Sequence, residues 1–368
     1  LRLDHVLVEA NRADNTIGGE ALGGGIALVR SDARIAFSTI TANVATAQFG
    51  TLAAGAGIHS VDGTLIVEGS TVRGNAATGG ALALAAGGGI RADRLVVEQS
   101  EIVANRAVTT GSTGQTARGG GVAAETLTLL NGTVSGNLAR GAGYGGGLAM
   151  GAALVVNSTI VDNRTEAGGL GGGIAGSVTL ANSILAGNRI ASDGGTDADL
   201  YGALVSNGAN ILSSPIAGAA SGDLLVEPAA VIGTILGALA ANGGPTRSHA
   251  PLAGSVAIDA GRPADAVDAD GLPLVTDQRG VGFERLFGVA VDIGAVESEL
   301  APRPPLPGDD AVATCRATPV LIDVLVNDLD PSGAPLGGLS ILAGPASGAA
   351  LLLADGRIAY RPEAGFIG

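Results

Sequence analysis

Two glutamates have the residue type and the spacing that glycoside chemistry would need. Glu68 and Glu98 each lie seven residues before an asparagine that recurs along the chain, Asn75 and Asn105. If these asparagines mark equivalent points of successive coils, the two carboxyls project from adjacent strands, about 4.8 Å apart. That distance is close to the roughly 5–5.5 Å between the catalytic carboxyls of retaining glycosidases. A charged stripe on the surface of a soluble coil would show the same pattern, and we favour that interpretation.

Several aspartates have the spacing of ligands to a hard cation. Asp265, Asp268 and Asp270 form one group, and Asp328 and Asp330 form another. Carboxylate oxygens in such groups suit Ca²⁺, but neither group is followed by the distal glutamate of a complete ligand loop. Aspartates at these spacings also form turns, which is the interpretation that we favour. No other cofactor is expected, because the one cysteine and three histidines form no clustered zinc pattern.

A repeating pattern positions the two glutamates. An asparagine recurs at a nearly regular interval, with aliphatic residues three and eight places before it and, in most repeats, a serine five places before it. A glycine-rich triplet and a short aliphatic run lie between consecutive asparagines. The seven asparagines are Asn11, Asn43, Asn75, Asn105, Asn137, Asn163 and Asn188. Self-similarity at this period indicates a solenoid.

The content of each repeat favours a parallel β-helix over a leucine-rich repeat. A leucine-rich repeat has a large apolar residue five places before its asparagine, where this chain has mostly serine. The other half of a leucine-rich repeat is often helical, and a glycine triplet disfavours a helix. Each period contains three strand-like runs instead. We therefore predict an all-β fold, a right-handed parallel β-helix solenoid with three strands per turn, plus a partial C-terminal β-sandwich. The recurring asparagines would stack in a buried hydrogen-bonded ladder.

The same register predicts further rows of stacked side chains. A second ladder is expected at a neighbouring corner, from Gln99, Asn131, Asn157 and Asn182. A row of mostly threonines should face outwards, made of Thr39, Thr71, Glu101, Thr133 and Thr159. His59 and Arg91 should form another outward pair on adjacent coils.

Composition excludes several classes of function. The formal net charge of −14 argues against nucleic acid and against anionic membrane surfaces. The longest apolar run, about residues 229–241, is too short to span a bilayer, so we expect no membrane insertion within this chain. Lysine is absent, which excludes mechanisms that need a lysine base or Schiff base. Aromatic residues make up 2% of the chain, which counts against an ordinary carbohydrate cleft.

After the repeats of residues 1–190, residues 191–297 are expected to form one or two irregular final turns, near residues 197–212, and then a C-terminal region. They contain four motifs in order: NGGPTRSHA (242–250), GSVAIDAG (254–261), TDQRG (276–280) and VDIGAVE (291–297). Together with the preceding repeats, this set resembles the bacterial choice-of-anchor Q domain family, whose fold is a pectin-lyase-like β-helix. The resemblance covers roughly residues 130–297. It implies a secreted or cell-surface protein and supplies no catalytic assignment.

The remaining residues indicate a linker and a second domain. Residues 298–308 contain four prolines and should be stiff and extended. Residues 309–368 resemble the start of a bacterial Ig-like or cadherin-like domain, through VLVNDLDP (324–331) and the segment from Tyr360 to Phe366. We expect strands near residues 311–314, 320–326, 339–342 and 357–360. Because a complete sandwich has about seven strands, this domain is expected to be incomplete and the chain to be part of a longer protein.

Taken together, the sequence predicts a secreted or cell-surface bacterial protein. Its β-helix would act as a structural, adhesin-like display module with a surface glycan or extracellular matrix as a partner. The alternative is a polysaccharide lyase or glycoside hydrolase that acts on a face of the β-helix, with Glu68 and Glu98 as the candidate catalytic residues.

Overall fold

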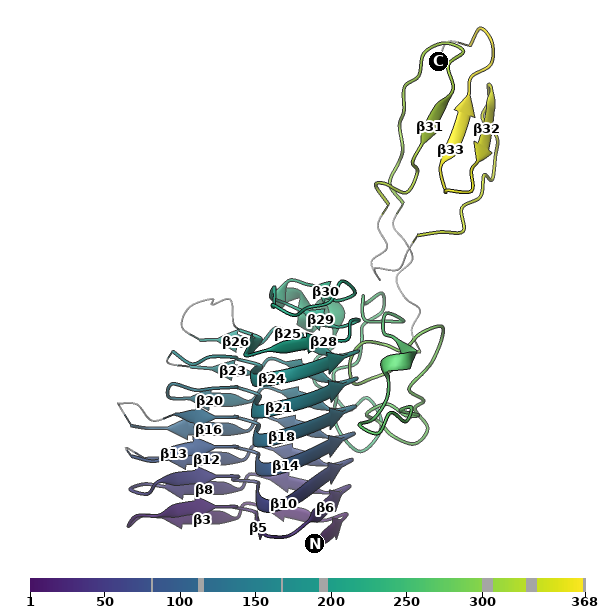
Figure 1. The fold of residues 1–368 in the computed structure, drawn as a ribbon. Helices are drawn as coiled ribbons and strands as arrows, with labels where there is room; N and C mark the ends of the chain where they lie inside the picture. Colours follow the sequence, from purple (N-terminus) through teal and green to yellow (C-terminus); the bar gives the residue numbers. More distant parts are fainter. Residues whose placement is uncertain are drawn as a thin grey trace. The chain divides into compact units, whose positions relative to one another are not determined.

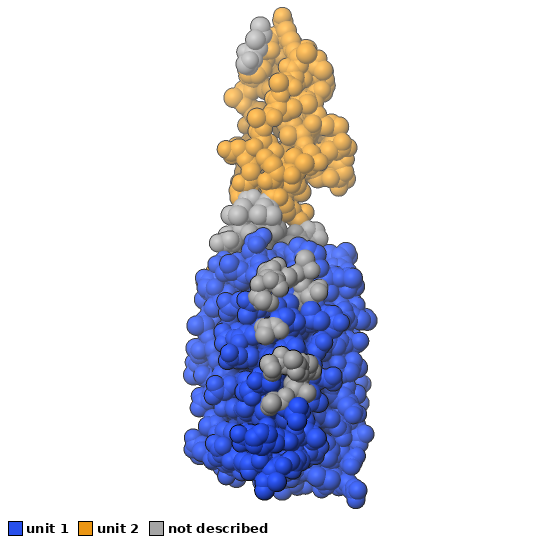
Figure 2. All heavy atoms as spheres, turned by 90° about the vertical axis from the view of Figure 1, so that its left-hand side faces the viewer, with its two compact units in different colours: residues 1–252, 257–300 blue, residues 253–256, 301–368 orange. Residues whose placement is uncertain are grey.

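The computed structural model describes residues 1–80, 82–111, 116–166, 168–191, 198–299, 307–328 and 336–366 (Figure 1). The chain divides into two compact units, coloured blue and orange in Figure 2. Unit 1 comprises residues 1–252 and 257–300, and unit 2 comprises residues 253–256 and 301–368. Most of the predicted linker, residues 300–306, lies outside the described residues.

Unit 1 is a parallel β-helix whose coils build four stacked parallel sheets, named A to D here (Figure 1). Sheet A contains β1 (Arg2–Asp4), β5 (Ile26–Val29), β6 (Ala33–Ala36), β10 (Ile58–Glu68), β14 (Ile90–Glu98), β18 (Val122–Leu130), β21 (Leu148–Val156), β24 (Ile174–Ala181), β27 (Leu200–Tyr201) and β28 (Leu204–Ser206). Sheet B contains β2 (Leu7–Glu9), β7 (Thr39–Thr41), β11 (Thr71–Arg73), β15 (Glu101–Val103), β19 (Thr133–Ser135), β22 (Thr159–Val161), β25 (Ile184–Ala186), β29 (Ile211–Leu212) and β30 (Leu224–Leu225). Sheet C contains β3 (Arg12–Asn15), β8 (Val44–Ala47), β12 (Ala76–Gly79), β16 (Arg106–Thr109), β20 (Leu138–Arg140), β23 (Arg164–Thr165) and β26 (Arg189–Ile190). Sheet D contains β4 (Glu20–Leu22), β9 (Leu52–Ala54), β13 (Leu84–Ala86) and β17 (Ala117–Arg118).

The predicted fold class is confirmed, but two details of the coil differ from the prediction. The runs after the glycine triplet and around the first aliphatic residue fuse into one long strand of sheet A, as in β10, with a register shift between Ser60 and Thr64. The strand that follows each asparagine, in sheet C, was not predicted. Its sequences, such as Ala76–Gly79, have two to four residues and contain alanine or glycine at several positions, and these residues are depleted in strands.

The aliphatic positions of the repeat fill the interior of the coil. From the second coil on, the sheet A position eight before the asparagine is buried, as in Val67, Val97 and Leu129, which are 0–1% exposed. The sheet B position three before it is buried in the same coils, whereas Leu3 and Val8 of the first coil are partly buried. Each fully buried valine, leucine or isoleucine stabilises the fold by roughly 1.5–3 kcal/mol. In a second core between sheets C and D, the clustered hydrophobic residues are all alanines.

The asparagine ladder is present and buried. Nδ2 of Asn75 donates to Oδ1 of Asn105 (2.9 Å), and Nδ2 of Asn105 donates in turn to Oδ1 of Asn137 (3.1 Å). The third glycine of each triplet lies against this ladder. A Cβ on Gly89 would come within 3.0 Å of the Asn105 side chain, so the glycine triplets leave the space that the ladder occupies.

The ladder ends in a carboxylate. Asn188, its last asparagine, donates from N and from Nδ2 to Oδ1 of Asp199, both at 3.0 Å. A carboxylate only accepts hydrogen bonds, so it receives the last donor without requiring a further coil. Oδ2 of Asp199 accepts the Ser213 hydroxyl at 2.5 Å. Burial raises the pKa of the Asp199 carboxyl.

A second internal ladder, which was not predicted, is built from the serines that lie five places before five of the seven asparagines, and Gly132 interrupts it. The backbone N–H of Ser38 donates to Oγ of Ser70, and that of Ser70 donates to Oγ of Ser100, both at 3.0 Å. After Ser183 the row continues through Asn210 and ends at Asp223. Both ladders therefore finish in an aspartate at the C-terminal end of the coil.

Residues 236–252 and 257–299, which we call the strap, form no further coils. The irregular final turns of residues 191–297 include β27 to β30, and the region with the four motifs follows them. Three short helical segments lie in or just before the strap: η1 (Pro228–Ala230), η2 (Val231–Ile235) and η3 (Pro263–Asp265). The strap lies along the outer face of sheet B (green in Figure 1). The later coils of this face are therefore covered: Thr133 and Thr159, predicted to face outwards, are 0% exposed, whereas Thr39 and Thr71 are partly exposed.

The residues expected to form a second ladder bind the strap instead. Gln99, Asn131, Asn157 and Asn182 do occupy corners, with φ of +44 to +49°. Their amides do not stack on one another. Asn131 donates to the carbonyl oxygen of Thr276 (2.9 Å), and Asn182 both donates to and accepts from the backbone of Arg262.

The four strap motifs meet in a buried polar network. Arg247 of the first motif pairs with Glu101 of the coil at 3.0 Å, and Asp259 of the second donates its N–H to Asp292 of the fourth at 2.7 Å. Gln278 of the third accepts the Thr133 hydroxyl at 2.5 Å. These motifs attach the strap to the coil.

Unit 2 contains a three-stranded antiparallel sheet in the order β31 (Val320–Ile322), β33 (Ile358–Arg361), β32 (Ala349–Leu352). The strand expected near residues 357–360 is present, and the one expected at 320–326 is limited to Val320–Ile322. Those expected at 311–314 and 339–342 are absent, and β32 was not predicted. Its Ala-Ala-Leu-Leu sequence has weak strand propensity, so pairing with β33 determines its conformation.

Candidate functional site

Glu68 and Glu98 are paired in register on adjacent strands of sheet A, as predicted. Both are half-buried, and Glu68 forms an ion pair with Arg34. The pKa of Glu98 is raised, mainly by burial and then by the neighbouring charges of Glu68 and Asp268. Carboxyls with different environments suit an acid and a nucleophile, but neither residue lines the groove described below. A catalytic role for the pair stays a prediction.

His59 and Arg91 are also paired in register, but His59 is only 4% exposed. Burial, followed by the positive charge of Arg91, lowers the pKa of His59 to about 4, so its imidazole is neutral at pH 7. Arg91 is partly neutralised by Asp93, with 3.1 Å between NH1 and Oδ1.

The first group of candidate metal ligands forms turns. Oδ1 of Asp268 accepts the backbone N–H groups of Asp270 (2.9 Å) and Leu272 (2.8 Å). Asp265 is the last residue of η3. This role as turn-forming residues is the one that we favoured from the sequence.

In the second group, Oδ1 of Asp328 accepts the N–H of Gly308 at 2.7 Å, and Asp330 lies outside the described residues. Within the described parts of the chain, no three or more His, Cys, Asp or Glu side chains are placed to hold a metal ion. A Ca²⁺ site at the predicted aspartates stays a prediction.

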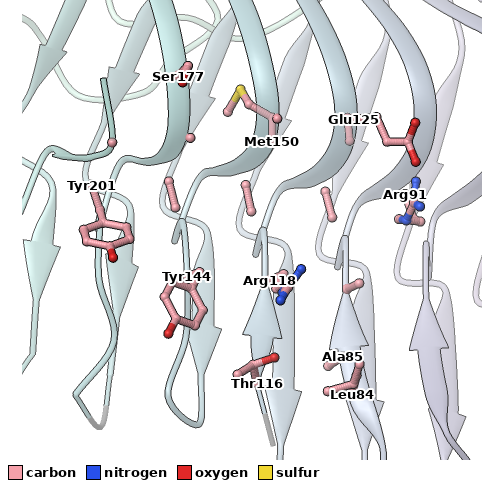
Figure 3. Close-up of a pocket in the computed structure, with 18 of the residues that line it drawn as sticks. Leu84, Ala85, Arg91, Thr116, Arg118, Glu125, Tyr144, Met150, Ser177 and Tyr201 are labelled. Atoms are coloured by element: carbon pink, nitrogen blue, oxygen red, sulfur yellow. The ribbon is translucent and has the colours of Figure 1, made fainter. Parts of the chain in front are cut away.

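A groove of about 750 Å³ lies between sheet A and the strands of sheet D in unit 1 (Figure 3). It crosses β14, β18, β21, β24 and β27. Four strand spacings of about 4.8 Å give it a length of about 19 Å. The groove is therefore long enough for an extended chain of several monomer units.

Small side chains create the groove. One outward row of sheet A runs from Arg91 through Ala123, Ala149 and Ala175 to Tyr201, in register. The three alanines, which are 6–8% exposed, leave a trough between the large residues at its two ends. Leucine or valine at these positions would fill it.

The walls carry the polar groups. Arg118 and Tyr144, joined by a parallel bridge, lie along one wall, while Glu125, Met150 and Ser177 lie along the other (Figure 3). The Arg118 guanidinium forms no ion pair with any described residue. The groove thus combines an apolar floor with an available cation, a carboxylate and hydroxyls at its rim.

Two of the three tyrosines of the chain meet in this groove. The ring centroids of Tyr144 and Tyr201 are 6.1 Å apart, and the rings are inclined by 46°. Aromatic residues make up only 2% of the chain, so this pair concentrates most of its tyrosine surface in one place.

The register of the repeats could have predicted that Arg118 and Tyr144 lie next to each other. Arg118 and Tyr144 each immediately precede a glycine triplet, so they occupy equivalent positions of adjacent coils. Tyr201 had no such signal, because the glycine triplet is absent from its coil.

Comparisons with known proteins bear on unit 2. The family model of the bacterial Ig domain matches residues 302–368. No curated protein and no solved structure matches the chain. The Ig-like prediction for the C-terminal segment is supported, and the resemblance of residues 130–297 to the choice-of-anchor Q family stays a prediction.

Among the described residues, none of the helices is long and apolar enough to cross a membrane.

Proposed function

We propose that this protein is a secreted or cell-surface display module whose β-helix binds an extended glycan chain in the groove. The observation that carries the proposal is the groove itself, with Tyr144 and Tyr201 side by side above a floor of alanines. The bacterial Ig domain match at residues 302–368 supports the surface location, since sandwich domains of this class are common in cell-surface proteins.

The chemistry of the groove suits a carbohydrate. Tyrosine presents an apolar ring face and a hydroxyl, which complements the C–H face and the hydroxyl edge of a sugar ring. Arg118 and Glu125 supply one donor group and one acceptor group on opposite walls. A linear polymer repeats its groups at a fixed interval, as does a β-helix, so successive sugars can contact successive coils.

The scaffold supports display. Two hydrogen-bonded ladders run through the coil and the strap covers part of the sheet B face, so the groove is built on packed elements. A site on packed strands keeps its geometry when free, which reduces the entropy lost on binding.

A glycan array that includes neutral, uronic-acid and sulfated oligosaccharides would test the proposal, with affinities of the hits measured by calorimetry. Tyr144→Ala should weaken binding about tenfold, which corresponds to about 1.4 kcal/mol. Phe287→Ala, which removes a half-exposed aromatic of the strap, is the matched control and should leave binding unchanged. Absence of glycan binding, or equal effects of the two substitutions, would refute the proposal.

A second candidate function, glycoside hydrolysis at Glu68 and Glu98, is favoured by the raised pKa of Glu98 beside an ion-paired partner carboxyl. Release of reducing ends from a polysaccharide would identify a hydrolase. Unsaturated products would identify the lyase considered above. Binding without either product supports the display module.

A further inference from the structure

A second recess, of about 430 Å³, lies at the corner between sheets B and C and shares no residue with the groove. Three arginines line it, Arg106, Arg164 and Arg189, together with Leu138 and Asp162. We call it the arginine recess.

The coil sets the spacing of the three arginines. Arg106, Leu138, Arg164 and Arg189 follow one another in register on β16, β20, β23 and β26, which are stacked in Figure 1. Arg164 and Arg189 are therefore one strand apart and Arg106 is two strands from Arg164. At about 4.8 Å per strand, the second separation is about 10 Å, with the Leu138 side chain between the two cations.

The recess is open because the corner residues are small. Gly74, Ala104 and Gly136 adopt left-handed φ of +55 to +66° at this corner. A Cβ on Gly74 would have no atom within 4 Å, and one on Gly136 would meet only the Ala104 nitrogen at 4.0 Å. The guanidinium groups therefore border free space.

Cations outnumber carboxylates here. Arg189 pairs with Asp162, and Arg164 shares Glu166 with Arg140 at 3.6 and 3.2 Å. Arg106 forms no ion pair with any described residue. Stacked like charges repel one another, so an anion bound between them would stabilise the arrangement. This excess of positive charge is local, because the whole chain carries −14.

We propose that the arginine recess binds a small ligand with two tetrahedral oxyanion groups, sulfate or phosphate esters, separated by two strand spacings, about 10 Å. One group binds the adjacent pair Arg164 and Arg189, and the other binds Arg106. The planar guanidinium fork matches such oxyanions with two parallel hydrogen bonds. Leu138 contacts the uncharged middle of the ligand. A long polyanion is disfavoured by the strongly negative charge of the protein. This site goes beyond the proposed function, since it lies outside the groove.

The test measures binding of inorganic sulfate, inorganic phosphate, a disulfated disaccharide and a bisphosphorylated sugar by calorimetry, at constant ionic strength in chloride. The two-group ligands should bind at least tenfold more tightly than the inorganic ions. Whichever ester binds better identifies the source of the oxyanion. Arg106→Gln should reduce a two-group ligand to the affinity of the matching inorganic ion.

The matched control is Arg94→Gln, which removes an exposed arginine outside the recess and should have no effect. Arg106→Lys keeps the charge without the fork and should bind with intermediate affinity. Arg106 and Arg94 are both exposed, so both variants should fold, which circular dichroism verifies. Absence of saturable binding by all four probes, or equal affinities for wild type and Arg106→Gln, would overturn the proposal. Tyr144→Ala should leave oxyanion binding intact, so failure of this site is distinguishable from failure of the groove.

Discussion

Replacing Asn105 by alanine removes a central link of the asparagine ladder. Its Oδ1 accepts the N–H of Asn75 at 3.0 Å and the Nδ2 of Asn75 at 2.9 Å. Its Nδ2 donates to the carbonyl oxygen of Val72 at 2.9 Å and to Oδ1 of Asn137 at 3.1 Å. The side chain is 1% exposed, so water cannot replace these partners without opening the corner.

The cost follows from what the substitution leaves without a partner. Nδ2 of Asn75 keeps its bond to the carbonyl oxygen of Ile40, and Oδ1 of Asn137 keeps the backbone N–H of residue 105. The backbone N–H of Asn75 loses the partner described above. A buried donor without a partner costs about 1–3 kcal/mol, and the remaining lost bonds add to it, so we expect a loss of about 3 kcal/mol in the free energy of unfolding.

Asn11→Ala is the matched control. Asn11 is the first member of the same ladder and is exposed, so water can satisfy the groups that its side chain leaves. We expect a loss of about 0.5 kcal/mol or less, as for other surface substitutions. Guanidinium-chloride unfolding of both variants, followed by circular dichroism, measures the difference. Equal losses for the two substitutions would refute the claim that the buried hydrogen bonds of the ladder stabilise the fold more than the exposed ones. A loss for Asn105→Ala of about 0.5 kcal/mol or less would refute it as well.

Three further predictions concern the strap, the glutamate pair and unit 2. Burial, and then the charge of Glu297, raise the pKa of Asp292 from 3.8 to about 7. The folded protein therefore binds a proton at Asp292 more tightly than the unfolded chain does. This contribution of Asp292 to stability is fully present below about pH 4 and is lost as the pH rises through about 7. At about 1.4 kcal/mol per pKa unit, the free energy of unfolding should fall by up to about 4 kcal/mol between pH 4 and pH 9. Asp292→Asn should flatten this slope in denaturant titrations, and an unchanged slope would contradict the assignment. Glu68→Gln combined with Glu98→Gln should leave glycan affinity unchanged in calorimetry, whereas loss of a measurable hydrolysis rate would favour the hydrolase. In limited proteolysis unit 2 should be cleaved before unit 1, because Pro362 is its only buried residue within 307–328 and 336–366. Amide exchange at Val320–Ile322 as slow as in sheet A would count against this.

The repeating half of the fold could be predicted from sequence because its signals recur in every coil. The spacing of Asn75, Asn105 and Asn137 determined the register, and the structure pairs Glu68 with Glu98 as that register requires. Sheet C could not be predicted in this way, because its short strands form through contact with the coils above and below.

The position of the strap could not be predicted from the sequence either. Its contacts join residues far apart in the chain, such as Thr133 with Gln278, 145 residues away. A single sequence contains no signal that links such positions. The amides of Gln99 and Asn131 were correctly placed at corners, but whether they stack or bind another segment depends on that long-range contact.

The groove depends on side-chain size at particular coil positions. Ala123, Ala149 and Ala175 are ordinary residues in the sequence, and only the large residues that flank them in register turn the row into a trough. The carboxylates that the sequence singled out lie elsewhere. The row of small alanine side chains therefore indicates the groove better than the positions of the carboxylates do.

The most direct test of the groove is a crystal structure of the protein with the tightest-binding oligosaccharide from the array. We predict an extended glycan that crosses from β14 to β27, with sugar rings against Tyr144 and Tyr201 and a hydroxyl or carboxylate at Arg118. A glycan bound to the strap, or one centred on Glu68 and Glu98 with the groove empty, would contradict the proposed function.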